Sequence, residues 1–402
     1  MSTSPRRRGK LIVSGILFWY PLAGVTYQFL HYLLGLKRLG WDVYYIEDSG
    51  RWLYDPRTRV ITGDALPNVS QVAPVLAAHG FEGKWAFRGA YPGGRCYGMQ
   101  ESEVLALYRE ADVLLNVTGA QEIRDEHRSI ARRIYVESDP FGSQVKLFNG
   151  DPLMRALLDA HDTWFSFGEN LGQSDCGVPL DRTWLPTRQP IALDLWAPTA
   201  AKRATLGATE SGESGTTYNT ITTWHNDGKT VVYRDEVYHW TKDREFVNYL
   251  QLPEQRRATR FELATDADPA SRELLTRHGF LVRDALGISS DVGDYHAYIR
   301  GARAEFTVAR DQYVRPRTGW FSDRSASYLA AGRPVITQET GFSKTLPTGR
   351  GLFGFSNIDD VLAAVDAIES DYAAHSRAAL EIAREYFAAE KVLASLLERA
   401  GL

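Results

Sequence analysis

The spacing of apolar side chains alternates between two periods along the first part of the chain. Residues 11–15 are a continuous apolar run, which predicts a buried strand. Residues 25–39 carry apolar side chains on one broad face, which predicts a helix that ends at Gly40. Residues 42–48 predict the next strand, and short links of this kind are typical of a parallel sheet. The same alternation continues to residue 167, so we expect one doubly wound α/β unit in this half.

Prolines and tryptophans interrupt the alternation over residues 184–198, and such a segment is typical of an ordered linker between domains. The α/β pattern then restarts with a strand at 217–223 and ends with helices at 358–368 and 373–398. The sequence therefore predicts an α/β fold with two tandem Rossmann-like, doubly wound domains. We place the first domain at 1–183, the linker at 184–198, the second domain at 199–375, and at 376–402 a last helix that packs back on the first domain.

Charge and composition narrow the classes of function. The chain has 402 residues, 44% hydrophobic and 24% charged, with 46 Lys and Arg against 50 Asp and Glu and a net charge of −4. A globular enzyme has this composition, whereas a general nucleic-acid binder needs a basic face. Cys96 and Cys176 are far apart, which fits a reducing cytoplasm and gives no cysteine-based metal site. We therefore expect a cytoplasmic protein that binds no nucleic acid.

The first residues imitate a secretion signal, because basic residues at 6–8 and Lys10 precede an apolar run at 11–25. Serine, glycine and proline interrupt that run, however, and a long amphipathic helix follows instead of a cleavage site. We expect the run to begin with a buried strand. No later stretch reaches the ~18 apolar residues that a membrane span needs, so we expect no membrane partner.

Residues 313–342, YVRPRTGWFSDRSASYLAAGRPVITQETGF, combine the features of a phosphate site. A loop with arginines leads through Gly319 to a helix that opens at Ser322. The free N–H groups and the positive dipole end of such a helix hold phosphate well. Gly319 lets the backbone approach a ligand, and Arg317 and Arg324 could neutralise a diphosphate through paired hydrogen bonds. The alternative is a core helix capped by Ser322, with solvated arginines.

The part GWFSDRSASYLAAGRPVITQETGF resembles the donor-site segment of GT-B glycosyltransferases, especially the spore-maturation glycosyltransferase-like proteins. Its AAGRPVI element resembles the helix–strand corner of family-one-like and family-four-like transferases. The resemblance implies two domains facing a cleft, with a UDP- or dTDP-linked sugar held by the second. The chain departs from the pattern at Ser327, where many retaining members carry a glutamate that holds ribose. The donor-binding residues implied are Arg317, Gly319, Trp320, Phe321, Ser322, Asp323 and Arg324, of which Asp323 caps the helix or holds a ligand hydroxyl.

The loop after the next strand lies where GT-B proteins hold the sugar. The resemblance therefore implies that Gln338, Glu339 and Thr340 bind sugar hydroxyls and that Gly341 allows close approach. An ordinary polar loop is the alternative interpretation. In the first loop of the second half, Lys229 or Lys242 could reach the diphosphate.

That same loop contains Asp227 and Gly228, a pair that favours a hairpin turn. We prefer the hairpin to a diphosphate contact there. The nucleobase is expected to contact the backbone around residues 282–286.

Carboxylates at the strand ends of the first half are candidates for a catalytic base. Glu137 and Asp139 are two carboxylates at one strand end, and a neighbouring carboxylate can raise a pKa toward the range useful for a base. Asp139 with Pro140 is also a common turn opener, which is the structural alternative. Asp48 and Glu169 are weaker candidates of the same kind.

Two motifs are rejected on their context. Residues 349–354 match G-x-G-x-x-G, but no strand feeds that glycine-rich stretch directly. Asp266 and Asp268 match a D-x-D metal motif, but Pro269 follows and a helix begins, so Asp268 is better read as its N-cap. We therefore expect no metal site and no bound cofactor beyond the nucleotide-sugar co-substrate.

The sequence thus predicts a metal-independent glycosyltransferase that moves a sugar to a hydroxyl or amine of a small-molecule acceptor, acting as a monomer or homodimer. Residues 88–98, with four glycines and a proline, predict a loop near the acceptor. Tyr20, Trp52, Trp85 and Tyr91 lie in or beside loops of the first half and could stack on that acceptor, or merely seal the edges of the core. The alternatives are a nucleotide-sugar epimerase or hydrolase, and a non-catalytic carbohydrate-binding protein.

Overall fold

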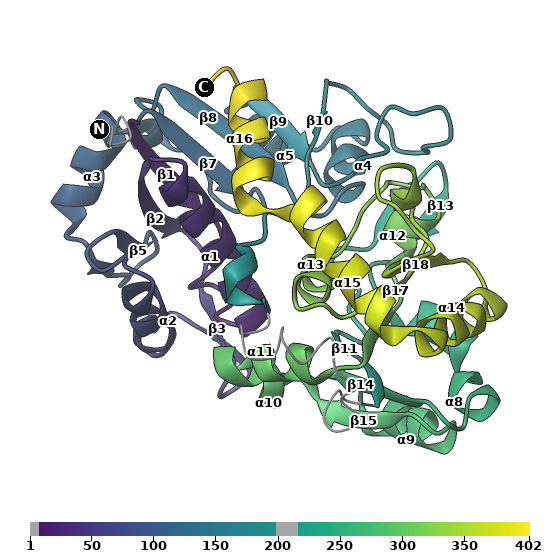
Figure 1. The fold of residues 1–402 in the computed structure, drawn as a ribbon. Coiled ribbons are helices and arrows are strands. Elements are labelled where there is room, and N and C mark those ends of the chain that lie inside the picture. The colour runs from purple at the N-terminus through teal and green to yellow at the C-terminus, as the bar shows by residue number, and fades with distance from the viewer. Residues whose placement is uncertain (1–7, 198–215) are drawn as a thin grey trace, which may run out of the picture.

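The computed structural model describes residues 8–197 and 216–402 (Figure 1). The arginines at 6 and 7, the last residue of the predicted linker, and residues 199–215 of the second predicted domain lie outside the described residues. Two sheets, each covered by helices, form two lobes that lie side by side. We call the lobe that begins the chain the first lobe and the other the second lobe.

The first lobe has an eight-stranded sheet that is parallel except for its last pair. Leu11 and Val13 face one side of the sheet and Ile12 faces the other, and all three are buried. Because both faces are covered, the strand is apolar throughout, which is why its sequence is a continuous apolar run. In spatial order the strands are β10 (Leu185–Pro186), β9 (Thr163–Ser166), β8 (Arg132–Glu137), β7 (Val113–Val117), β1 (Lys10–Ser14), β2 (Asp42–Ser49), β5 (Trp85–Gly89) and β6 (Cys96–Gly98).

The second lobe repeats the plan with a six-stranded parallel sheet. In spatial order its strands are β15 (Leu281–Asp284), β14 (Arg260–Thr265), β11 (Thr217–Thr222), β16 (Ala304–Thr307), β17 (Val335–Gln338) and β18 (Leu352–Phe355). Two small antiparallel pairs stand apart from the large sheets: β3 (Leu53–Asp55) with β4 (Val60–Thr62), and β12 (Val231–Tyr233) with β13 (Glu236–Tyr238). The strand order of both sheets agrees with the predicted doubly wound arrangement.

Helices cover the sheets on both faces. Those of the first lobe are α1 (Ala23–Arg38), α2 (Leu66–Ala78), α3 (Glu101–Glu110), α4 (Gly142–Phe148) and α5 (Pro152–Asp159). Those that follow are α7 (Asp243–Phe246), α8 (Leu252–Gln255), α9 (Pro269–Arg277), α10 (Ala285–Ser289), α11 (Val292–Gly301), α12 (Asp311–Val314), α13 (Asp323–Ala330), α14 (Ile358–Ser370), α15 (Tyr372–Ile382) and α16 (Ala389–Arg399). Short 3-10 turns lie at Asp125–His127, Leu193–Leu195, Val247–Tyr249 and Phe342–Lys344.

The last helix predicted from the sequence is broken. The α-helical path ends at Ile382, a π-turn spans Ala383–Phe387, and Ala388 is extended with φ −52° and ψ 122°. The cause is tertiary, because Ile191 of the linker pairs with this point: its N–H donates to the Phe387 carbonyl at 2.7 Å and its carbonyl accepts from Ala389 at 2.9 Å.

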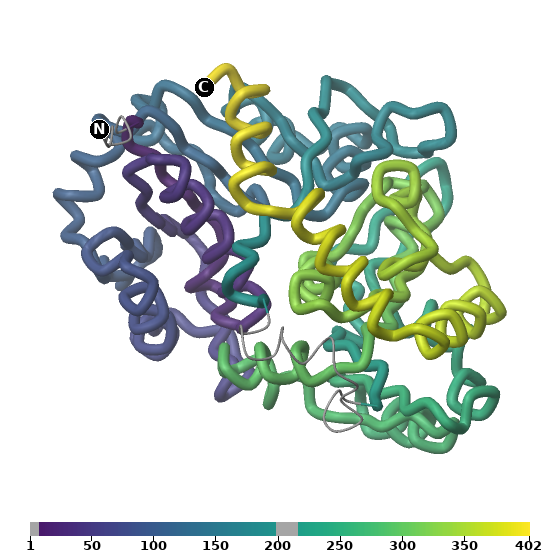
Figure 2. Tube along the Cα trace, viewed as in Figure 1, coloured from purple at the N-terminus to yellow at the C-terminus, as the bar shows by residue number. Residues whose placement is uncertain are grey.

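The break lets the chain end cross between the lobes (Figure 2). Ile382 of α15 lies in the core of the second lobe, whereas Leu393 and Leu396 of α16 pack with α1 in the core of the first lobe. Gly35 of α1 makes the approach close, since a Cβ there would lie 2.6 Å from Leu393.

Two other local predictions are wrong. Residues 88–98 are not one loop, because β6 pairs antiparallel with β5 within them. A three-residue edge strand among glycines has too short a pattern to read. The predicted hairpin at Asp227 and Gly228 lies instead at Arg234 and Asp235, which join β12 to β13 with φ of 50° and 64°. Two residues with positive φ suit the tight turn between twisted strands.

Candidate functional site

The carboxyl ends of both sheets face a cleft of about 480 Å³ between the lobes. Open α/β sheets bind ligands at such strand ends, because the loops and helix N-termini gather there. The strand-end residues that line it are Asp139 after β8, Thr222 of β11, Asp266 after β14, Asp284 of β15 and Arg310 after β16. The starts of α1 and α13 face the same cleft, from opposite lobes.

The N-terminus of α13 opens directly into the cleft. Ser322 is its N-cap residue, Asp323 and Arg324 are its first two residues, and all three line the cavity. The Ser322 hydroxyl does not cap the helix, so the Ser-capped core helix is not what the structure contains. The first N–H groups of a helix lack partners within the helix. This corner can therefore receive an anion.

Three cations gather at this corner. Lys242, Arg310 and Arg324 all line the cleft. Lys242 is 5% exposed, and within the two described ranges its ammonium has no hydrogen-bond or ion-pair partner. Burial, together with the nearby Arg324 and Arg310, lowers the pKa of Lys242 well below its ordinary value. A buried ammonium without a partner is costly, and an anion in the cleft would relieve that cost.

A buried carboxylate fixes one of these cations. Glu305 of β16 is fully buried and accepts from Arg324 Nε at 2.6 Å. The other end of the same guanidinium donates to the Ile221 carbonyl at 2.5 Å and to Thr307 Oγ1 at 2.9 Å. Arg324 is thereby held at one orientation. Arg310 is also held, because its guanidinium lies 3.9 Å above the Trp240 ring and its Nε donates to the Trp240 carbonyl.

Asp139 faces these cations from the first lobe. Its carboxylate accepts from the Tyr313 hydroxyl at 2.7 Å and lies 3.1 Å from Lys229 Nζ. Burial by itself raises the pKa of Asp139, but Lys229, Arg310 and the Tyr313 bond outweigh it and hold the pKa below its ordinary value. Asp139 is therefore ionised at neutral pH and can accept a proton or a hydroxyl hydrogen bond.

Asp323 has the opposite electrostatics. Burial, and then the charge of Asp139, raise its pKa to about 7, although Arg324 works against them. The two carboxylates are thus separated in pKa by their surroundings, which is typical of functional sites.

Glu137 does not line the cleft. It is 2% exposed at the end of β8, and one carboxylate oxygen accepts from Gln144 Nε2 and from Ser166 Oγ, each at 2.7 Å. Burial raises its pKa to about 7. Its carboxyl lies in the interior behind Asp139, where it ties β8 to α4 and β9.

Several residues predicted to bind the donor lie at a contact between the lobes and outside the cleft. Asn170, in the loop after β9, donates from its backbone N to the Thr318 carbonyl at 3.0 Å and from Nδ2 to the Arg317 carbonyl at 2.8 Å. The Arg317 side chain pairs with Asp175 at 2.9 Å. Gly319, with φ +80°, allows this approach, because a Cβ would lie 2.4 Å from the Asn170 nitrogen.

The loop after β17 completes this contact. The Thr340 carbonyl accepts from the Gly319 N–H at 2.7 Å, and Gly341 has φ +99°. The Glu339 carboxylate accepts from the Gly341 N–H, so it folds back on its own loop. None of Glu339, Thr340 and Gly341 lines the cavity.

The two aromatic residues of the predicted segment differ in place. Trp320 lines the cleft, stacks on Tyr313 with centroids 4.3 Å apart, and donates from Nε1 to the Ser138 carbonyl. Phe321 is buried against Phe342 and Phe387.

The sequence did not indicate some of the residues that line the cleft. Lys242 was considered for the diphosphate only as an alternative to Lys229. Arg310 lies in the loop after β16, which ends at Thr307. Asp284, Ala285 and Leu286 also line the cleft, and they belong to the stretch at 282–286 that was expected to contact the nucleobase. The signal available was their position at strand ends. Tyr54 and Arg59 also line the cleft, but they come from the β3–β4 hairpin, which the sequence reasoning did not foresee.

The rejected motifs behave differently from one another. Asp268 caps α9 as predicted, accepting from the N–H groups of Ala270 and Ser271. Asp266 lines the cleft and accepts from the Trp224 N–H at 2.6 Å. Across residues 8–197 and 216–402, no three His, Cys, Asp or Glu side chains gather as a metal site would require. Metal independence stays a prediction.

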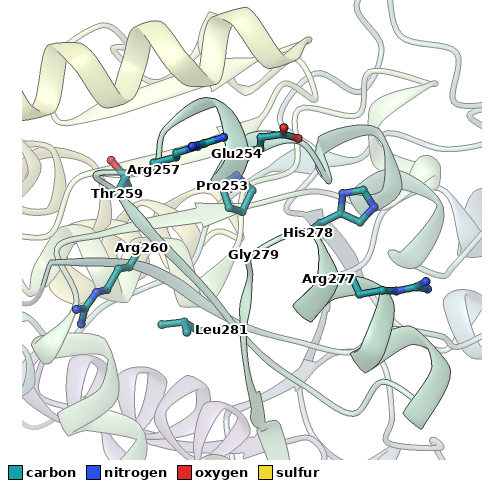
Figure 3. A pocket seen from close by; sticks show the side chains of 9 residues that line it. All are labelled: Pro253, Glu254, Arg257, Thr259, Arg260, Arg277, His278, Gly279 and Leu281. Carbon is teal, nitrogen blue, oxygen red and sulfur yellow. The ribbon is translucent and has the colours of Figure 1, made fainter.

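A second hollow of about 680 Å³ lies at the opposite end of the second sheet (Figure 3). Arg260 and Leu281 start β14 and β15 there, and Arg257, Arg277 and His278 surround the opening. It faces the amino ends of the strands. Ligands of open α/β sheets bind at the other end, so we take the cleft between the lobes as the candidate site.

Comparison with known proteins shows the fold of this chain but assigns it to no family. No family model matches the chain, and neither does any curated protein sequence. Solved structures do match over nearly the whole chain. An alpha-glucosyltransferase in complex with UDP has a TM-score of 0.58 at 10% identity, covering 98% of this chain and 100% of that one. HepE of Anabaena in complex with UDP has a TM-score of 0.53 at 11% identity, covering 98% and 99%.

A glycosyltransferase of Rickettsia africae is similar too, with a TM-score of 0.52 at 11% identity and 98% of both chains covered. The alpha-glucosyltransferase also occurs in complex with UDP and a 13-mer DNA. The chain therefore has the GT-B fold, with two Rossmann-like α/β units facing a cleft, as the sequence predicted. Among the described helices, none combines the length and the apolar character that crossing a bilayer would demand.

Proposed function

We propose that this protein is a glycosyltransferase that moves a sugar from a UDP- or dTDP-linked donor to a hydroxyl or amine of a small-molecule acceptor. Within the GT-B fold we place it nearest the spore-maturation glycosyltransferase-like proteins, on the residues of its donor-site segment. The similar alpha-glucosyltransferase and HepE structures hold UDP, which favours a nucleoside diphosphate as the ligand class. The proposal includes a reaction without metal, a cytoplasmic location, no nucleic-acid partner, and a monomer or homodimer.

The observation that carries the proposal is the corner at the start of α13. Lys242, Arg310 and Arg324 converge there on helix N–H groups, and the Lys242 ammonium is buried without an anionic partner among the described residues. A diphosphate supplies the missing negative charge, and its oxygens accept from guanidinium, ammonium and backbone N–H groups. The residues at the start of α13 border the cavity, whereas Arg317 and Lys229 do not.

The chemistry then follows from the two sides of the cleft. An acceptor hydroxyl attacks the anomeric carbon, the bond from that carbon to the β-phosphate oxygen breaks, and the electron pair leaves with the diphosphate. Lys242, Arg310 and Arg324 stabilise the charge that develops on that leaving group. Asp139, ionised and on the acceptor side, takes the hydroxyl proton. Glu137 is too deeply buried to reach the acceptor and supports the strand end that carries Asp139.

The test combines binding with turnover. Thermal shift with UDP, dTDP and ADP is expected to raise the melting temperature of the wild type with UDP or dTDP. Asp139→Asn is expected to keep that shift and to lose release of UDP from a UDP-sugar in the presence of acceptors by at least about a hundredfold, as for loss of a general base. If no nucleotide shifts the melting temperature, the proposal fails. UDP release that needs no acceptor would favour a hydrolase instead.

A further inference from the structure

Aromatic side chains follow one another from the surface of the first lobe toward the cleft. The rings of Trp19 and Tyr20 have centroids 5.1 Å apart, and those of Tyr20 and Tyr54 are 5.6 Å apart. Trp19 and Tyr20 belong to the loop between β1 and α1, and Tyr54 belongs to β3. A backbone bond from Tyr54 N to the Trp19 carbonyl, 3.0 Å long, holds the two segments together.

The hairpin extends this series with exposed side chains. Trp52 directly precedes β3, and Ile61 of β4 lies directly opposite Tyr54. Leu53, between Trp52 and Tyr54, is buried, which places the exposed Trp52 on the outer side with Tyr54. Trp52 is 56% exposed and Ile61 is 53% exposed. We call Trp19, Tyr20, Trp52, Tyr54 and Ile61 the aromatic shelf.

The shelf is continuous with the candidate site. Tyr54 is a member of the shelf and also lines the cleft that Asp139 and the α13 corner line. Figure 1 shows β3 beside α10 and α11 of the second lobe, and the pair of Arg59 with Asp284, 3.4 Å apart, joins the hairpin to β15 there. A molecule on the shelf therefore has one end at the place where a sugar would be transferred.

The charges around the shelf are already engaged. Arg57 pairs with Asp55 at 3.1 Å, Arg59 pairs with Asp284, and the Arg51 guanidinium lies 4.8 Å above the Trp19 ring. A polynucleotide would need several cations free for its phosphates, and a sugar would need polar groups free for its hydroxyls. The shelf consists mainly of ring faces and an isoleucine, and its hydrogen-bonding groups are the hydroxyls of Tyr20 and Tyr54 and the indole N–H groups of Trp19 and Trp52. Large ring faces with a few polar groups at their edges suit a flat aromatic body that carries a hydroxyl or amine.

From these observations, and resting on the proposed function, we infer that the acceptor is a planar aromatic compound that carries a hydroxyl or amine. Its ring system lies on the aromatic shelf, and its hydroxyl or amine enters the cleft beside Asp139. The first lobe thus selects for a fused-ring or phenolic acceptor over a saccharide.

Isothermal titration with 2-naphthol, maltose and an oligothymidylate tests this inference, with UDP titrated into the same proteins. The wild type is expected to bind 2-naphthol and to bind the other two at least about tenfold more weakly. Tyr20→Leu and Trp52→Leu each keep an apolar side chain, and each is expected to weaken 2-naphthol binding about fivefold to tenfold. Leu153→Ala, at an 80% exposed leucine on α5, is the matched control and is expected to bind like the wild type.

The outcomes separate the two proposals. UDP affinity unchanged in the shelf variants, with 2-naphthol affinity reduced, supports the inference. Shelf variants that are folded by circular dichroism and bind 2-naphthol like the wild type would overturn it, and so would a wild type that prefers maltose or the oligothymidylate. Loss of UDP binding in every protein, with the 2-naphthol pattern intact, would refute sugar transfer from UDP and leave the shelf as an aromatic binding surface.

Discussion

Replacing Lys242 by methionine tests two effects of this buried cation, its cost to the stability of the free protein and its contribution to nucleotide binding. Methionine keeps the length of the side chain and removes the charge of a residue that is 5% exposed. Because burial and the neighbouring arginines lower the pKa of Lys242 in the folded protein, its charge destabilises the free enzyme. That cost is complete below the folded-state pKa and disappears as pH rises past the ordinary value of 10.5. Without nucleotide, Lys242→Met is therefore expected to be more stable than the wild type at pH 7, and the difference is expected to shrink at higher pH.

The same change has the opposite effect on nucleotide binding. Lys242 contributes one charge-assisted contact to the diphosphate, and such a contact is worth about 1.5–3 kcal/mol. UDP is therefore expected to bind Lys242→Met about ten- to a hundredfold more weakly. Urea unfolding measures the stability, and isothermal titration measures the affinity.

A matched control uses an exposed cation. Lys391 is 56% exposed and pairs with Glu385 at 2.7 Å, so Lys391→Met is expected to change neither quantity by more than about 0.5 kcal/mol. The contrary result is a Lys242→Met variant that unfolds at lower urea than the wild type and still binds UDP with the same affinity. That result would make Lys242 a structural residue.

Three further predictions concern carboxylates and a close backbone contact. Since the pKa of Asp323 is about 7, its carboxylate is charged above that pH and repels a diphosphate. From pH 6 to pH 8, the UDP affinity measured by titration is therefore expected to fall more in the wild type than in Asp323→Asn. Glu137 is buried, and its pKa is raised from 4.5 to about 7. The wild type is therefore expected to lose up to about 3 kcal/mol of unfolding free energy as pH rises from 4.5 to 7. Urea unfolding curves of Glu137→Gln should lack this pH dependence. Gly319→Ala combines positive φ with a Cβ 2.4 Å from Asn170 and is expected to cost about 3 kcal/mol or more in the same assay, whereas Gly93→Ala, with φ +78° and open space, should cost about 1 kcal/mol. Equal losses of unfolding free energy in the two glycine variants would contradict the close approach of Gly319 to Asn170.

The sequence was informative wherever a local pattern controls the structure. The run at 11–15 predicted β1 to within one residue, because a strand buried on both faces must be apolar throughout. Asp268 caps α9 as predicted, because capping depends on the nearest few residues. The start of α13 at Ser322 was also predicted, although the Ser322 hydroxyl does not cap the helix. With Trp320, it is the part of the predicted donor segment that borders the cleft.

Contacts between distant segments were not predictable in this way. Arg317 and Gly341 read as ligand residues, yet the structure uses them, with Asn170 of the first lobe, to join the lobes. Glycines and arginines serve close packing and ligand binding equally well, so the sequence pattern is the same for both uses. The break at Ala388 likewise depends on Ile191, about two hundred residues earlier in the chain.

What the sequence determined by itself is the α/β order of elements and the helix that opens at Ser322, since propensity, periodicity and capping act over a few residues. Only the tertiary structure decided which charges meet. Lys242, Arg310 and Arg324 come from three separate segments, and Asp139 comes from the other lobe. Their convergence depends on how two sheets place their carboxyl ends across one cleft, and pairing between sheets and lobes leaves no periodic signal in the chain.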